Sequence, residues 1–142
     1  MSARARAVLG VAGLVLAFQG AAAACGICVE DKIAAVYDHA IVTQALGRKH
    51  HVAFFLIDGP LVPGAGMRRA IEALAGSAHG VDKGSVRVSV EAASLSVAFD
   101  PRRVPFAAVH RELDRKLSSK KLSLLPTRVM DQTAGLRAIG RQ

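Results

Sequence analysis

The spacing of apolar side chains changes along the chain, and each change predicts a new element. Apolar positions three and four residues apart run through residues 25–46, which predicts one long helix that ends before Gly47. Residues 52–57 are almost wholly apolar, which is typical of a strand covered on both faces. A loop rich in glycine and proline follows over residues 59–66, and Met67 begins a second helical spacing. The first half of the chain therefore predicts helix, strand, loop and helix.

The second half of the chain alternates between the same two periods. Apolar and polar residues alternate over 86–90 and over 95–99, which predicts two half-buried strands. A helical spacing returns over 106–117. Residues 122–130 predict a last strand, and Pro126 restricts it to a sheet edge or a bulge because proline cannot donate a ladder hydrogen bond.

The order of these elements over residues 52–130 is strand, helix, strand, strand, helix, strand. This order predicts an α+β fold of the ferredoxin-like βαββαβ type, with an extra helix over residues 25–46. Four segments in this range have a recognisable pattern: Ile71-Glu72-Ala73-Leu74, Gly80-Val81, Val86 to Val90, and Val97-Ala98-Phe99-Asp100-Pro101. They resemble the heavy-metal-associated domain of copper chaperones and metal-pumping ATPases. The resemblance implies an antiparallel sheet with two helices and the last strand at an edge.

The chain departs from that family at its metal site. Family members hold a soft metal with a C-x-x-C pair in the loop that enters the first domain helix. The matching positions here are Gly64 and Met67, and neither supplies a thiolate. Met67 keeps a soft thioether, although a methionine at this spacing is also a good core residue. A metal function therefore cannot be taken over from the resemblance.

The two cysteines of the chain are Cys25 and Cys28, spaced C-x-x-C at the start of the predicted extra helix. A helix N-terminus stabilises thiolates, the form that binds metals and attacks disulfides. Two soft ligands suit Cu(I) better than Zn(II), which takes four ligands. The same pair also fits a thiol-disulfide redox site or an inert local disulfide. Spacing alone leaves these alternatives open.

The lengths of the extra helix and the first strand favour the metal interpretation. A helix over residues 28–46 is about 28 Å long at 1.5 Å per residue, and the strand that follows has a similar length. Joined by a short connection, the two run antiparallel, which brings the cysteines back toward the loop before Met67. We therefore expect Cys25 and Cys28 as metal ligands and Met67 as a third soft ligand. His50 and His51 are candidates for an accessory site.

The first 24 residues have the pattern of a cleavable signal peptide. Arg4 and Arg6 give a positive start, an apolar run covers residues 8–18, and residues 21–24 are all alanine. The sequence therefore predicts a signal peptide over residues 1–24, one domain over residues 25–142, and a periplasmic or secreted protein. A cysteine directly after a signal sequence is a lipidation candidate, so membrane attachment is expected only if Cys25 is acylated.

Composition and motifs restrict the classes of function that the sequence allows. Without the predicted signal peptide, 17 basic and 11 acidic side chains leave a formal net charge of +6, a balance that favours anionic partners or membrane surfaces. The basic pairs are scattered along predicted helices and loops, which is more typical of solvated faces; they are Arg68-Arg69, Arg102-Arg103, Arg115-Lys116 and Lys120-Lys121. Aromatic residues make up only 4% of the chain, which is too few for the stacking platforms of an RNA-binding sheet, so no nucleic-acid partner is expected. No G-x-S-x-G motif is present, which argues against a hydrolase. The sequence predicts a non-enzymatic carrier of a soft metal, Cu(I) above others, with a metal-transport protein or metalloprotein as partner. The alternatives are a thiol-disulfide redox protein and a metal-free interaction domain.

Overall fold

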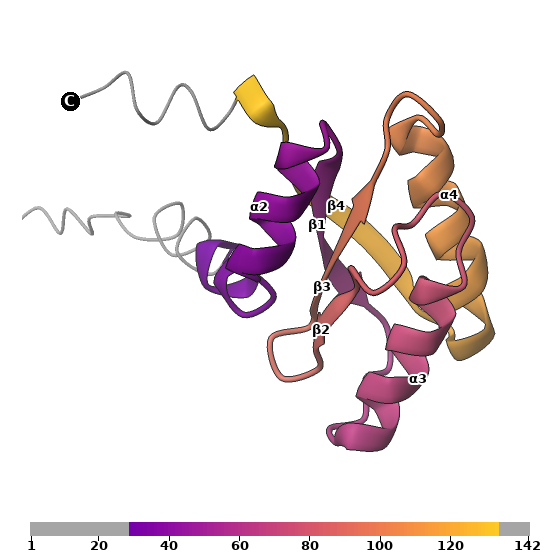
Figure 1. Cartoon of the computed structure of the whole chain (residues 1–142). Coiled ribbons are helices and arrows are strands. Elements are labelled where there is room, and N and C mark those ends of the chain that lie inside the picture. The colour runs from indigo at the N-terminus through magenta and orange to yellow at the C-terminus, as the bar shows by residue number, and fades with distance from the viewer. Residues whose placement is uncertain (1–28, 134–142) are drawn as a thin grey trace, which may run out of the picture.

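The sheet is built around β1 (His51–Asp58), in a computed structural model that describes residues 29–133. Four antiparallel strands lie in the order β2-β3-β1-β4 (Figure 1). The other strands are β2 (Arg87–Ser89), β3 (Ser94–Phe99) and β4 (Ser123–Met130). One helix joins β1 to β2 and another joins β3 to β4, so the core has the ferredoxin-like topology. This strand order confirms the predicted α+β class with a four-stranded antiparallel sheet.

Two amphipathic helices cover one face of the sheet, which we call the helix face. They are α3 (Ala65–Gly76) and α4 (Phe106–Leu117), and a 3-10 turn, η1 (Ser118–Lys120), continues α4. The helix face holds the larger core, and Ile71, Leu113 and Leu117 are completely buried in it. Burial of these side chains supplies most of the apolar stabilisation of the domain.

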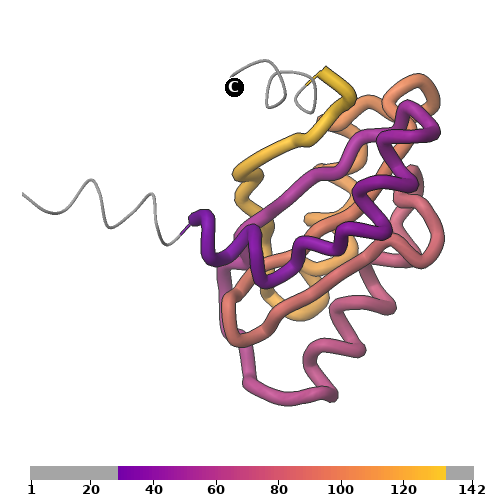
Figure 2. Tube along the Cα trace, turned by 60° about the vertical axis from the view of Figure 1, so that its left-hand side comes forward, coloured from indigo at the N-terminus to yellow at the C-terminus, as the bar shows by residue number. Residues whose placement is uncertain are grey.

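The opposite face of the sheet, which we call the arm face, is covered by a second and smaller layer. A short helix over residues 29–34 and then α2 (His39–Gly47) lie against it (Figures 1 and 2). The buried side chains of this layer form a separate cluster. Its members are Ile33, Val36, Val42, Ala45, Val52, Phe54 and Ala98. All six residues of β3 are buried as a result, so the prediction that this strand is half-buried was wrong.

The single helix predicted over residues 25–46 is also corrected, because the chain leaves the helical conformation between residues 35 and 38. Asp38 is extended, with φ −118° and ψ 109°, and its carboxylate accepts hydrogen bonds from the backbone N–H groups of Ala40 and Ile41. An aspartate that binds the amides of the following turn favours a helix start over a helix interior. The carbonyl of Val36 accepts a hydrogen bond from Ser96 Oγ at 2.9 Å, which fixes the break on the sheet.

Strand β4 lies at an edge of the sheet, as Pro126 predicts. The β1–β4 register shifts between Phe54 and Phe55, opposite this proline. Thr127 Oγ1 donates a hydrogen bond to the carbonyl of Phe54 at 3.0 Å within the irregular segment. The proline is therefore accommodated by a bulge, as expected for a residue without a ladder donor.

No helix within residues 29–133 has the length and apolar character needed to cross a bilayer.

Candidate functional site

The candidate metal-binding cysteines, Cys25 and Cys28, lie outside the described residues, as does the predicted signal peptide. The structure does show how the chain directly after them is held. We call residues 29–37 the N-terminal arm. Its buried anchors are Ile33 and Val36, and Val29 packs against the same cluster of the arm face.

Polar contacts fix the arm at both of its sides. Lys32 Nζ donates a hydrogen bond to the carbonyl of Ala92 at 2.8 Å, in the turn between β2 and β3. Glu30 pairs with Arg128 of β4 on the other side. Asp38, directly after the arm, accepts from Arg87 Nε at 2.9 Å. The arm is therefore attached to the β2–β3 turn and to β4, and residue 29 has a defined place on the arm face.

The arm reaches the end of β1 that leads into the loop before α3. The carbonyl of Ala93, next to the residue that Lys32 contacts, accepts a hydrogen bond from the backbone of Ile57 at 2.8 Å. The lengths of the helix and the strand predict this return to the same end of the sheet. They do not predict the face, and the arm and α3 lie on opposite faces of the sheet.

Met67, the predicted third ligand, is the third residue of α3. Its side chain is half-buried and packs against the core of the helix face, as the packing interpretation expects. Gly64 is the N-cap of the same helix, at φ 134°. Both residues therefore stand at the start of α3. The described residues give no support to Met67 as a ligand shared with the arm, and its ligand role stays a prediction.

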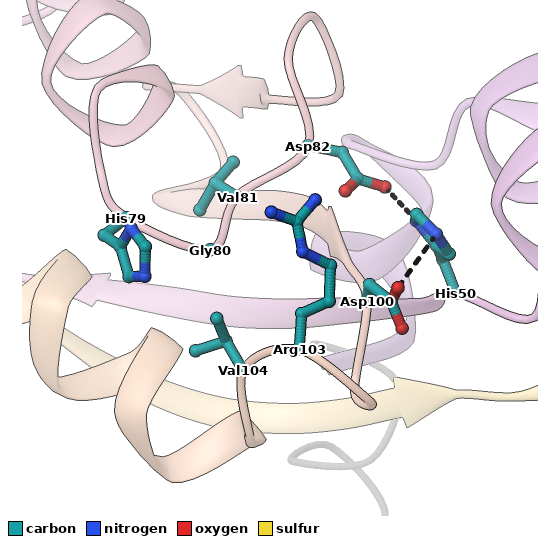
Figure 3. Close-up of a pocket in the computed structure, with 8 residues that line it drawn as sticks. All are labelled: His50, His79, Gly80, Val81, Asp82, Asp100, Arg103 and Val104. Atoms are coloured by element: carbon teal, nitrogen blue, oxygen red, sulfur yellow. Dashed lines mark hydrogen bonds and ion pairs between the residues drawn. The ribbon is translucent and has the colours of Figure 1, made fainter.

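A pocket of about 300 Å³ lies at the opposite end of the sheet (Figure 3). It forms where the α2–β1, α3–β2 and β3–α4 connections meet. We call it the histidine pocket. Its lining residues are His50, His79, Gly80, Val81, Asp82, Asp100, Arg103 and Val104. Its size is at the lower limit for small-molecule sites.

His50 is engaged on both sides of its ring in this pocket. Nδ1 lies 2.6 Å from Asp82 Oδ2, and Nε2 lies 3.6 Å from Asp100 Oδ2. The hydrogen bond from Arg102, opposed in part by desolvation, lowers the pKa of Asp100 from 3.8 to about 2. Asp100 therefore stays ionised beside His50 at neutral pH. Because both ring nitrogens face carboxylates, His50 ties the three connections together at this end of the sheet.

The other histidines do not converge on a metal site. His50 and His51 line different pockets, and the ring of His51 packs edge-on against Phe99. His110 Nε2 contacts the carbonyl of Leu124 at 2.8 Å, which is a structural role. Within residues 29–133, no group of three or more His, Cys, Asp or Glu side chains could hold a metal ion.

Sequence reasoning missed the contacts of His50 because its partners are far away in the chain. Asp82 is 32 residues from His50, and Asp100 is further still. Neither carboxylate has a spacing that would mark it as a partner. The available signal was weaker: His50 directly precedes a buried strand, and Asp100 directly follows one. Because β1 and β3 are neighbouring antiparallel strands, these positions come to the same end of the sheet.

Comparison with known proteins adds little to this geometry. No family model matches the chain, and no curated protein matches it. Among solved structures, the chain is similar to a copper-binding domain from HMA7, a P-type ATPase, with 18% identity and a TM-score of 0.44. The match covers 56% of this chain and 96% of that domain. A likeness at this level carries no argument about function, and the ferredoxin-like assignment rests on the strand order itself.

Proposed function

We propose that this chain is an exported protein that binds or carries a soft metal ion, Cu(I) above others, through Cys25 and Cys28. The observation that supports the proposal most is the attachment of the arm that follows the pair. Lys32, Glu30 and Ile33 hold this arm on the sheet, so the C-x-x-C pair is joined to a fixed point of the domain.

The chemistry of the two thiolates favours Cu(I). A C-x-x-C pair offers two soft sulfur ligands, which satisfy Cu(I) in a near-linear arrangement, whereas structural Zn(II) requires four ligands. In this proposal the ion is cargo and not a catalytic cofactor. A metal-transport protein or metalloprotein would receive it.

The proposal is tested with reduced protein purified from the compartment to which the cell delivers it. We expect it to bind about one Cu(I) per chain against a moderate competitor. Cys25→Ser or Cys28→Ser alone is expected to abolish most of this binding, because one thiolate cannot hold the ion in place of two. Met67→Leu is the matched control, since it keeps the packing and removes only the sulfur. We expect no more than a small loss there, because Met67 packs on the helix face.

Other outcomes of this experiment separate the alternatives. Undiminished Cu(I) binding by both serine variants would contradict the proposal. No Cu(I) binding, together with thiol exchange far faster than that of a small dithiol, would identify a redox protein that uses the same pair. Absence of both activities would leave a metal-free interaction domain.

A further inference from the structure

The connection between β1 and α3, residues 59–64, exposes an apolar tip. Val62 is 62% exposed, the highest value among the exposed large apolar side chains of the described residues. Pro60 and Pro63 on either side are exposed as well, while Leu61 packs against the core and anchors the loop. The two prolines restrict the backbone of the loop. The tip is therefore presented to solvent in a restricted conformation.

Exposed cations stand beside this loop. Arg68 and Arg69 lie in the first turns of α3, and Lys120 and Lys121 follow α4. The loop begins against the second pair, because a Cβ built on Gly59 would lie 2.5 Å from the carbonyl oxygen of Lys121. We call residues 59–64 and these four cations the basic loop surface.

The positive charges of the basic loop surface are not neutralised by ion pairs within the described residues. In the part of the chain that the structure describes, none of the four cations forms an ion pair. The carboxylates adjoining the loop and these cations along the chain are Asp58 and Glu72. Arg68 also lines a pocket with Asp38 and Glu72, so the excess of positive charge lies mainly at Lys120 and Lys121.

The opposite end of the sheet makes a useful comparison. Exposed cations such as Arg48 and Lys83 are present there too. The exposed large apolar side chains of the described residues are Tyr37, Val62, Leu125 and Val129, and none of them lines the pockets at that end. A single exposed apolar residue is ordinary on a protein surface. The combination of a proline-flanked apolar tip with unpaired cations is what distinguishes the basic loop surface.

We propose that the basic loop surface docks on an anionic phospholipid membrane. An apolar tip enters the boundary between headgroups and acyl chains, and flanking Lys and Arg side chains attract anionic headgroups. Charge complementarity selects this occupant, because the chain without residues 1–24 keeps a formal net charge of +6 (17 basic and 11 acidic side chains) and the four cations form no ion pair within the described residues. The binding is peripheral and depends on salt, since the attraction acts over a Debye length of about 8 Å at physiological ionic strength. It goes beyond the proposed metal function and does not depend on it.

The first test is sedimentation of the exported protein with vesicles, either of phosphatidylcholine alone or of phosphatidylcholine mixed with phosphatidylglycerol. We expect binding to the mixed vesicles that falls as salt is raised. Replacing both lysines, Lys120→Gln with Lys121→Gln, should weaken it by about fivefold for each charge removed. The matched control is Arg48→Gln with Lys83→Gln, which changes the net charge equally at the opposite end. All variants share one N-terminus, so any lipid on Cys25 contributes equally to each.

A second measurement reports on the loop itself. The chain has no tryptophan, so Val62→Trp introduces a single fluorophore at the tip. We expect its emission to shift to the blue with the mixed vesicles and not with phosphatidylcholine alone. Val129→Trp, at a position 38% exposed on β4, is the control that should not shift.

Three outcomes would overturn the membrane proposal. The first is an absence of binding to the mixed vesicles. The second is an equal loss in the two double variants, which would show that net charge alone drives adsorption. The third is a shift of the Val62→Trp emission by polyglutamate but not by vesicles, which would assign the surface to an acidic protein instead.

Discussion

The two faces of the sheet are held by different means. On the helix face, α3 and α4 bury a continuous apolar core that includes the fully buried Phe99 and Val109. On the arm face, a smaller apolar cluster is supplemented by side-chain links such as Ser96 to Val36 and Arg87 to Asp38. The helix face therefore determines the fold. The arm face is an added layer whose attachment holds residues 29–37, which directly follow the cysteines in the sequence.

The largest expected effect is on the helix face. Ile71→Asp would place an unpaired carboxylate at a completely buried position and is expected to unfold the whole domain. Small domains have only about 5–15 kcal/mol of stability in total, so they cannot absorb such a cost. Circular dichroism during denaturant unfolding measures the effect, with Arg69→Ala as a control that changes stability by about 0.5 kcal/mol or less. Equal tolerance of both substitutions would show that the core is assigned to the wrong residues.

A smaller and local effect is expected on the arm face. Val36→Asp should detach the arm, since Val36 is an apolar anchor of this layer and is only 3% exposed. Hydrogen exchange should then accelerate in residues 29–37 while the amides of β1 and α4 stay protected. Val36→Ala, which removes less apolar surface and adds no charge, should loosen the arm only slightly. Unfolding of all elements together in Val36→Asp would show that the two faces form one cooperative unit.

The smallest expected effect concerns the cap of α2. Hydrogen bonds from Ile41 N–H and from Arg87 lower the pKa of Asp38 from its ordinary value of 3.8. Because the folded-state pKa is depressed, the stabilisation is present above pH 3.8 and is lost as the pH falls through the lower folded value. Asp38→Ala should raise exchange of the first α2 amides by about fivefold at neutral pH.

The control for this cap is Asp38→Asn, which keeps an oxygen acceptor for the helix amides. It should preserve most of the protection of α2, but its protection should no longer vary with pH in the acidic range. If Asp38→Ala left the exchange of α2 unchanged, the attachment of this helix would depend on packing alone.

The periodicity of the sequence predicted most of the fold because local pattern and tertiary burial agree over residues 52–130. The break at Asp38 escaped prediction for a specific reason. Val36, Tyr37, Ala40 and Ile41 continue one helical stripe through it, while the capping bonds of Asp38 depend on a single side chain. Burial of β3 on both faces also escaped prediction, because Ser94 and Ser96 are polar residues of the kind expected at exposed positions but are buried.

The sequence predicts the type of ligand at the candidate site but not how the segments around it are arranged. The C-x-x-C spacing identifies two soft ligands without any structure. The position of Met67 relative to them was inferred by treating residues 25–46 as one rigid rod. The chain turns at residues 35–38 instead, and the arm crosses the face opposite to α3. No sequence pattern at Asp82 or Asp100 marks them as partners of His50, because each pairing depends on the register of distant strands.

The bulge opposite Pro126 has a consequence for the protein in bulk. A sheet edge with regular, unpaired backbone groups is a template on which another copy can add a strand. Here one edge strand, β4, is interrupted by a proline and a register shift, and the other, β2, is only three residues long. Neither edge offers a long regular ladder to a neighbour. Concentrated protein should therefore resist fibril growth by strand addition, even though its sheet is rich in apolar residues.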